Sequence, residues 1–240
     1  VTGLDAVRHQ VWAIDDDSRI DLLTSSFDAM DALYVADGHH RSASGARVAH
    51  ARRESGQNES ADASWNYFLS VIFPDNQMQI LDYNRVIRDL NGMTSQAFLD
   101  RVAGAFHVEA SDSPVKPASP GEFGMYLERR WYRLALPSDR IPDDPVARLD
   151  VSLLADNLIA PILGIIDQRT DDRIDFVGGI RGLEGLVKRV DSGEMAVAFS
   201  LPPTSMEALM AVADAGEVMP PKSTWFEPKL ADGLVSHVLD

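Results

Sequence analysis

The sequence predicts a mixed α/β protein in two lobes, with α+β as the open alternative. Short apolar runs typical of strands are interleaved with segments whose apolar residues recur at helical spacing. Near the C-terminus the order is strand, helix, strand, helix, which is typical of a small parallel or mixed α/β layer. The stretch 137–145 is rich in Pro and Asp and is the best linker. We therefore expect one lobe at 1–136 and a second, smaller α/β lobe at 146–240.

The first sixty residues predict strand, helix, strand and helix. Apolar and polar residues alternate from 9 to 14, which indicates a half-buried strand. The apolar residues of 20–30 have helical spacing. The apolar run 33–36 indicates a short strand that turns sharply at Asp37-Gly38 into a helix reaching about residue 53.

The middle of the chain predicts strands around one helix. The run 67–73 is almost continuously apolar, as in a strand buried on both faces, and 78–81 returns as a paired strand. Thr94 is expected to be the N-cap of the next helix, which carries Phe98, Val102 and Phe106. The alternating segments 123–127 and 131–136 predict a hairpin.

The second lobe begins with a helix from Val151 to about Ile159, which we expect Asp150 to cap. Further elements follow in this order: a strand at 174–177, a helix at 181–191, a strand at 195–199 and a helix at 204–213. Thr204 and Glu207 have capping-box spacing at the start of the last helix. The proline-rich segment 219–230 predicts a defined loop.

Composition excludes several classes of function. The 240 residues include 37 acidic and 22 basic side chains, a formal net charge of −15. Nucleic-acid binding depends on neutralising phosphates, so this balance argues against nucleic acid as a partner. The chain contains no cysteine, which excludes disulfides, thiolate nucleophiles and thiolate zinc sites.

Neither a membrane span nor a signal peptide is predicted. No apolar run approaches the roughly 18 residues of a membrane helix, and the first residues lack a signal core. We therefore expect a cytoplasmic protein without a membrane partner. The chain starts at Val1 without Met, which leads us to expect that N-terminal sequence is missing. The oligomeric state is left open.

The turn Asp37-Gly38-His39-His40-Arg41 is the strongest candidate site. The first N–H groups of a helix lack intrahelical partners, and the helix dipole adds roughly half a positive charge there. Gly38 lets a ligand approach the backbone, and Arg41 adds a planar cation suited to phosphate or carboxylate. The sequence thus predicts an anion site, the alternative being an ordinary capped turn with His39 and His40 on the surface.

A multiply charged anion needs a second cationic wall. Two segments are candidates, since both carry polar functions outside the predicted helices. We expect supporting roles, together with Asp37, for these residues: Asn84 and Arg85 at a strand end, and Lys222, Ser223 and Thr224 in the C-terminal loop. The loop lacks the glycines of a nucleotide-binding P-loop and has Pro220-Pro221 instead, so a Walker-type site is excluded. A packed C-terminal loop is the alternative.

No metal site and no catalytic residue are assigned. Adjacent histidines at a helix start diverge by about 100°, which disfavours joint ligation of one ion. No HExxH pair is present, and no serine lies in a nucleophile-elbow pattern.

Several motifs resemble a known family. These are His9-Gln10-Val11-Trp12, Tyr34 to Arg41, Leu149-Asp150-Val151, Met219 to Thr224 and Pro228-Lys229-Leu230. With them the whole chain resembles the bacterial and archaeal family of unknown function DUF1015, whose members usually carry a further N-terminal segment. The family has no established activity.

The turn is also similar to the phosphate-binding strand–turn–helix of the ParB/sulfiredoxin superfamily. This likeness implies a ParB/sulfiredoxin-like lobe at 1–136 and a phosphate cradle at Gly38, His39, His40 and Arg41. The superfamily includes CTP-binding ParB proteins, sulfiredoxins and kinases of free serine. The absence of cysteine excludes sulfiredoxin chemistry, and the acidic charge without a helix-turn-helix weakens a partitioning role.

The resemblance therefore implies binding of a nucleotide, with Mg²⁺ as a candidate cofactor, or of another anionic small molecule. Phosphoryl transfer to a small metabolite such as free serine is the enzymatic form of this hypothesis. The alternative is a regulatory or interaction module that binds an anionic ligand or partner without chemistry.

Overall fold

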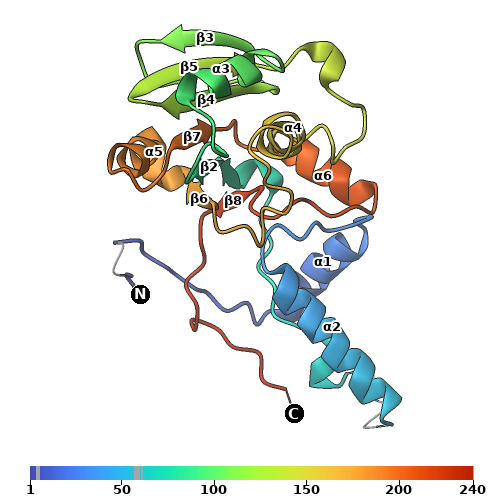
Figure 1. Ribbon diagram of the computed structural model, residues 1–240. Coiled ribbons are helices and arrows are strands. Elements are labelled where there is room, and N and C mark those ends of the chain that lie inside the picture. Colours follow the sequence, from blue (N-terminus) through green and yellow to red (C-terminus); the bar gives the residue numbers. More distant parts are fainter. Residues whose placement is uncertain (4–5, 57–59, 61, 240) are drawn as a thin grey trace. The chain divides into compact units, whose positions relative to one another are not determined.

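The computed structural model describes residues 1–3, 6–56, 60 and 62–239. The chain divides into two units, which we describe separately (Figure 1). Unit 1 comprises Val1–Pro74 and Pro228–Asp240, and unit 2 comprises Asp75–Glu227. The sequence places a boundary at 137–145, whereas residues on both sides of that stretch belong to unit 2 and share one sheet.

Unit 2 is organised around a six-stranded sheet. Its strands lie in the order β3 (His107–Ser111), β5 (Arg130–Ala135), β4 (Glu122–Leu127), β7 (Val197–Ser200), β2 (Tyr83–Ile87) and β6 (Ile174–Gly178). Every neighbouring pair is antiparallel. A second antiparallel sheet pairs β1 (Gln79–Leu81) with β8 (Trp225–Glu227). The predicted mixture of helices and strands is confirmed, and its antiparallel pairing is the α+β form.

The parallel or mixed layer expected near the C-terminus is wrong, because every neighbouring pair of strands in this sheet is antiparallel. Strand β6, helix α5 (Gly182–Asp191) and strand β7 follow one another as predicted. However, β2 lies between β6 and β7 and is antiparallel to both. The two later strands are therefore parallel to each other but not neighbours. Strand β2, which comes from much earlier in the chain, lies between them, and a local sequence pattern cannot reveal this.

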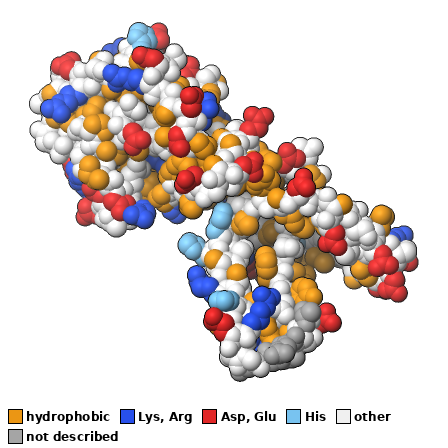
Figure 2. All heavy atoms as spheres, turned by 90° about the vertical axis from the view of Figure 1, so that its right-hand side faces the viewer, with side chains coloured by type: hydrophobic (Ala, Val, Ile, Leu, Met, Phe, Trp, Pro, Cys, Tyr) orange, Lys and Arg blue, Asp and Glu red, His pale blue; other side chains and the backbone are white. Residues whose placement is uncertain are grey.

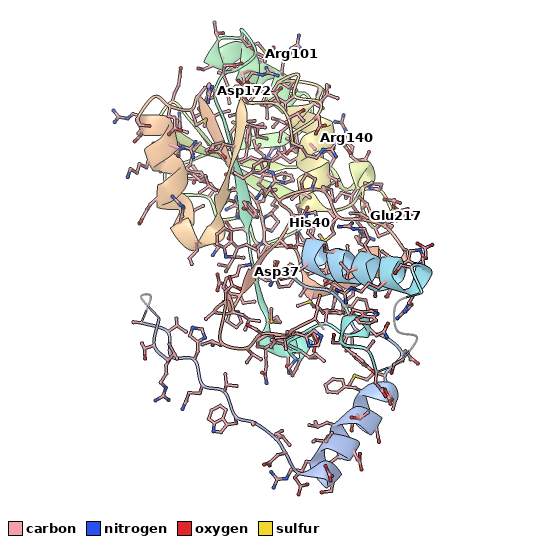
Figure 3. The ribbon with its side chains drawn as sticks, turned by 90° about the horizontal axis from the view of Figure 1, so that it is seen from below. Asp37, His40, Arg101, Arg140, Asp172 and Glu217 are labelled. Carbon is pink, nitrogen blue, oxygen red and sulfur yellow. The ribbon has the colours of Figure 1, made fainter. Side chains whose placement is uncertain are left out.

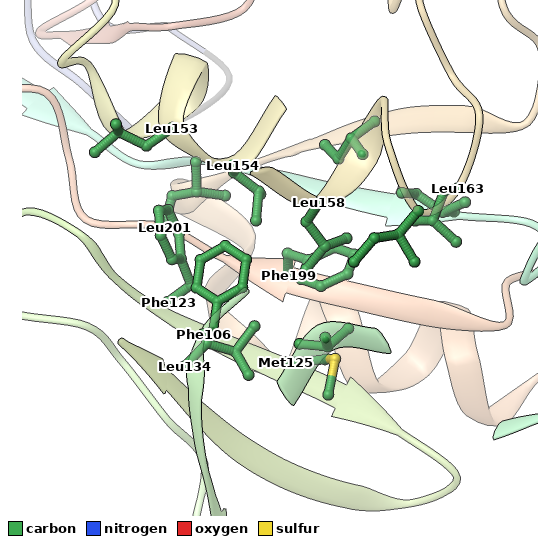
Figure 4. Close-up of a cluster of buried hydrophobic side chains, with 14 of the residues drawn as sticks. Phe106, Phe123, Met125, Leu134, Leu153, Leu154, Leu158, Leu163, Phe199 and Leu201 are labelled. Carbon is green, nitrogen blue, oxygen red and sulfur yellow. The ribbon is translucent and has the colours of Figure 1, made fainter. Parts of the chain in front are cut away.

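Helices cover both faces of this sheet. Alternate strand residues point to opposite sides, so Ile87 and Val86 enter different clusters. The larger cluster packs against α3 (Ser95–Ala103), α4 (Asp150–Leu154) and α6 (Met206–Asp214), and the smaller against α5. Figure 4 shows part of the larger cluster, including Phe123, Phe199 and Leu158. Three short 3₁₀ segments complete the unit: η2 (Asp75–Gln77), η3 (Ser138–Arg140) and η5 (Gly179–Arg181).

The predicted caps are partly confirmed. Thr94 Oγ accepts a hydrogen bond from the Ala97 N–H at 3.3 Å, as an N-cap does. At α6 the cap is Ser205 and not Thr204. At α4 the N-cap is Leu149, and Asp150 is the first helical residue.

The helix that begins with α4 continues as the π-helical segment η4 (Ala155–Ile159). The Ala160 N–H donates to the Ala155 carbonyl at 2.9 Å, which is the wider spacing of a π-turn. The predicted helix over 151–159 is thus present, but its second half is π-helical.

Unit 1 contains α1 (Asp17–Asp28), α2 (His39–Glu54) and the 3₁₀ turn η1 (Ser64–Asn66). Its one cluster of buried residues consists of Ala49, Ala63 and Trp65, among the residues described. The Arg52 guanidinium lies 4.7 Å from the centre of the Trp65 ring and joins α2 to η1. Both predicted helices of this region are confirmed.

The strands predicted at 9–14, 33–36 and 67–73 are wrong. All three segments are described, and none forms a ladder with another strand. Apolar side chains of these segments, such as those of Trp12 and Phe68, are exposed, and most of their surface is not covered by other parts of the chain. A sequence pattern typical of a strand shows only a local preference. A strand also needs a partner strand to pair its backbone N–H and C=O groups, and the local pattern does not show whether one exists. The segment 78–81 does form a strand, but its partner is β8 and not 67–73.

Two further expectations need correction. The sequence predicts Asn84 and Arg85 at a strand end, whereas both lie within β2, an interior strand of the six-stranded sheet. Strand β3 was not expected, and the C-terminal loop contains the short strand β8. Within the described part of the chain, no helix is long and apolar enough to cross a membrane.

Candidate functional site

The start of α2 has the features of an anion site. Gly38 is the N-cap, with φ 83° and ψ 25° in the left-handed region that favours glycine. No side chain of a described residue caps the helix. The N–H groups of the first turn therefore have no side-chain acceptor among the described residues. Asp37, which has the side chain of an N-cap, precedes the cap by one residue.

Arg41 folds back over this turn. A methyl group placed on Gly38 would lie 3.1 Å from Arg41 Nη2 and 3.3 Å from Cζ. The guanidinium thus lies close to the N-cap although the residue is exposed as a whole. Ser42 Oγ donates to the Gly38 carbonyl at 3.2 Å and fixes the first turn from its inner side.

A lysine from the end of the chain completes the cluster. Lys229 Nζ lies 3.2 Å from Asp37 Oδ2, while Asp37 Oδ1 accepts the Gly38 N–H at 2.8 Å. Partial burial acts to raise the pKa of Asp37, but the Gly38 N–H and the Lys229 ammonium outweigh it and lower the pKa. Asp37 is therefore a carboxylate that holds Lys229 at the start of α2.

His39 and His40 are exposed on the first turn. Figure 3 labels Asp37 and His40 at this end of α2. Figure 2 shows histidine and basic side chains gathered over the part of unit 1 that contains α2. The four residues of the predicted cradle thus share one turn. The second cation found there is Lys229, whose only sequence signal was its place in the Pro228-Lys229-Leu230 motif.

The other supporting residues lie in unit 2, around β2. Asn84 is fully buried; its Oδ1 accepts the Leu201 N–H at 3.0 Å, and its Nδ2 donates to Asp82. Arg85 is 1% exposed, and its Nη1 donates to the carbonyls of Tyr83 and Lys222. Asn84 thus connects β2 to the residue that follows β7, whereas Arg85 connects β2 to the C-terminal loop.

The C-terminal loop belongs to unit 2 as far as Glu227. Lys222 has a left-handed backbone, φ 56°, and its Nζ lies 5.6 Å from the centre of the Tyr83 ring. Ser223 is buried, and its Oγ donates to the Pro220 carbonyl at 2.6 Å. The Thr204 hydroxyl donates to the Ser223 carbonyl at 3.0 Å, and Thr224 is half-buried. The loop thus presents the Lys222 side chain and encloses Ser223.

These features define a mixed α/β protein with antiparallel sheets and a basic helix start. The family described as protein of unknown function (DUF1015) matches residues 1–152, and the chain belongs to this family. The family resemblance noted in the sequence is thereby confirmed. The likeness of the turn to the ParB/sulfiredoxin motif stays a prediction.

Other comparisons give more distant similarities. No curated protein matches the chain. Among solved structures, the chain is similar to a conserved hypothetical protein from Pyrococcus furiosus, with 16% identity, 88% of this chain and 81% of that chain covered, and a TM-score of 0.45. It is also similar to a free serine kinase in complex with AMP, with 17% identity, 88% and 78% coverage and a TM-score of 0.41.

Proposed function

We propose that this protein binds a nucleotide or another phosphorylated small molecule at the start of α2. Gly38, His39, His40 and Arg41 form the cradle. The observation that carries the proposal is the position of the Arg41 guanidinium, which lies over the N-cap of a helix that no described side chain caps. Backbone donors and a planar cation at one point are the elements of a phosphate site.

The local charge supports a multiply charged ligand. Arg41 and Lys229 contribute two cations, and Asp37 contributes one carboxylate. This local excess of positive charge stands out in a chain with a net charge of −15. An exposed helix end alone contributes only about 0.3–1 kcal/mol per charge, so the side-chain cations supply the larger part. Mg²⁺ would accompany a nucleotide as its counterion and would not need a protein cage.

Phosphoryl transfer to a small metabolite, such as free serine, is the enzymatic form of the proposal. Positioning and charge stabilisation carry most of such a reaction, and the cradle would supply both. Asp37 is a poor candidate for the base, because Gly38 and Lys229 already engage its two oxygens. This engagement favours the second candidate, a regulatory module that binds the anion without turnover.

The binding test compares two arginines of the same helix. Titration calorimetry with ATP, ADP, AMP and pyrophosphate, with and without Mg²⁺, should detect a ligand of the unmodified chain. Arg41→Ala should weaken it about tenfold or more, the usual effect of losing a hydrogen bond to a charged group. Arg47→Ala, on the exposed part of α2, is the matched control.

Equal loss in the two variants, or no binding of any of these compounds, would contradict the proposal. Turnover is a separate measurement. Release of ADP from ATP in the presence of L-serine or another hydroxyl acceptor distinguishes the kinase from the binding module.

A further inference from the structure

Unit 2 contains a cavity of about 370 Å³ that the α2 site does not involve. This volume is within the range of pockets that hold metabolites. Arg85 lies in its lining, together with Ser152 and Asp156 from the α4–η4 helix. Asp144, Asp167 and Arg169 also line it. The cavity thus joins the central strand β2 to charged residues from three other segments.

Arg85 is a buried cation without a carboxylate partner among the described residues. Its Nη1 donates to two carbonyls, while Nε and Nη2 have no acceptor in that part of the chain. The Phe176 ring, 5.1 Å from Cζ, covers one side of the guanidinium. Burial lowers the pKa of Arg85 to about 9, so the side chain stays protonated at neutral pH.

Such a cation could serve only to brace the C-terminal loop. The two hydrogen bonds to carbonyls would explain why this position has a side chain with N–H donors. They do not explain a full positive charge, because a buried charge without a counterion is strongly destabilising. A neutral donor would brace the loop at lower cost. A bound anion that enters the cavity would compensate the charge and use the remaining donors.

The acidic side chains of the cavity restrict which anion fits. Asp167 is engaged by Arg169, with contacts of 2.9 and 2.8 Å. Asp144 accepts the N–H groups of Val146 and Ala147 at 3.0 and 2.7 Å. Asp156 is exposed and has no partner among the described residues. The deep wall is therefore cationic, and the outer part keeps one unengaged carboxylate.

Asp156 lines the cavity because of its position on the α4–η4 helix. Ser152 and Asp156 are four residues apart and lie on one face of the helix. The switch to π-helical geometry begins at Ala155, which also lines the cavity. π-Turns are frequent at functional sites because they re-aim side chains. Ser152 is buried and adds a hydroxyl to the lining of the cavity.

We propose that this cavity binds a small zwitterion of the amino-acid class. Its carboxylate would pair with Arg85, and its ammonium group with Asp156. A nucleotide or a phosphate would meet three carboxylates and only one unengaged cation, so multiply charged anions are disfavoured. The inference concerns a second ligand in unit 2 and does not depend on the α2 site.

The test uses the full chain without nucleotide or phosphate, so the α2 proposal does not affect its outcome. Titration calorimetry and ligand-observed NMR would compare L-alanine and L-serine with propionate and ethylamine. Propionate lacks the ammonium group, and ethylamine lacks the carboxylate. At least one of the two amino acids should bind about tenfold more tightly than each fragment, as expected for a lost charged contact.

Asp156→Asn is the decisive variant, because the residue is exposed and its replacement leaves the core intact. It should weaken binding of the amino acid about tenfold and leave binding of propionate unchanged. Asp139→Asn, an exposed site outside the cavity lining, is the control and should change neither. Arg85→Lys should weaken both ligands if it folds. Failure of both amino acids to bind, or equal effects of Asp156→Asn and Asp139→Asn, would overturn the proposal.

Discussion

Asp150 makes the stability of unit 2 depend on pH. This half-buried residue begins α4, and its Oδ1 accepts the Gly121 N–H at 2.6 Å. Burial raises the pKa of Asp150 from 3.8 to about 6, although the Gly121 N–H acts in the opposite direction. The folded chain therefore keeps this proton up to about pH 6, whereas the unfolded chain loses it near pH 4.

The sign of the effect follows from proton uptake. Between the two pKa values the folded state binds more protons, so stability falls as the pH rises through this window. Above about pH 6 the loss is complete. The difference of about two pH units corresponds to about 3 kcal/mol. Asp150→Asn keeps an oxygen for the Gly121 N–H and removes the ionisation.

We compare the free energy of unfolding of Asp150→Asn with that of the unmodified chain. The difference in favour of the variant should be larger at pH 7.5 than at pH 4. The gain should approach about 3 kcal/mol. Urea denaturation at pH 4, 5, 6 and 7.5, followed by tryptophan fluorescence, measures it, since Trp131 is buried in unit 2. The control is Asp139→Asn, which removes an exposed charge. A stability difference that does not vary with pH would refute the reasoning.

Three further predictions concern single residues. Gly124→Ala should destabilise the sheet by about 1–3 kcal/mol or more in urea denaturation, because its methyl group would lie 2.5 Å from the Val115 carbonyl oxygen; an unchanged midpoint would contradict this packing. Gly45→Ala should stabilise α2 by up to about 1 kcal/mol in thermal unfolding followed by circular dichroism, since among the described residues the new methyl would contact Phe68 alone, at 3.8 Å; a lower melting temperature would show a closer approach. Thr94→Ala should cost about 1 kcal/mol through loss of the α3 cap, measured by urea denaturation against Thr94→Ser, which keeps the hydroxyl.

The sequence predicts elements well where the signal is local. The α3 cap at Thr94 and the β4–β5 hairpin depend on residues a few positions apart. The turn into α2 was likewise predictable, because Gly38 and the following helical residues are adjacent. The predicted strands 9–14 and 67–73 failed for the opposite reason. Alternation and apolar runs show what a strand would bury, but not whether a partner strand exists.

The residues of the candidate site also divide into those with a local sequence signal and those that depend on distant parts of the chain. The proposed cradle from Gly38 to Arg41 is a continuous segment, so it could be proposed from the sequence alone. Lys229 could not, since it reaches Asp37 across 192 positions. Arg85 was named for the wrong reason. A polar run after β1 indicated a strand end, whereas the chain continues into β2 and buries the guanidinium.

The two groups of cations differ in a way that assigns different ligands to them. Arg41 is exposed and Lys229 is held by a carboxylate, so water and Asp37 stabilise them without a ligand. Such an open, doubly cationic site can accept a multiply charged phosphate at little desolvation cost. Arg85 is buried and uncompensated, and the unengaged carboxylate in its cavity lining is that of Asp156. A singly charged carboxylate relieves the buried cation, whereas each additional negative charge would have to lie beside the carboxylates of the same lining. The physical difference between the sites therefore favours a phosphorylated ligand on α2 and a zwitterion in unit 2, and the calorimetric panels described above measure the two preferences separately.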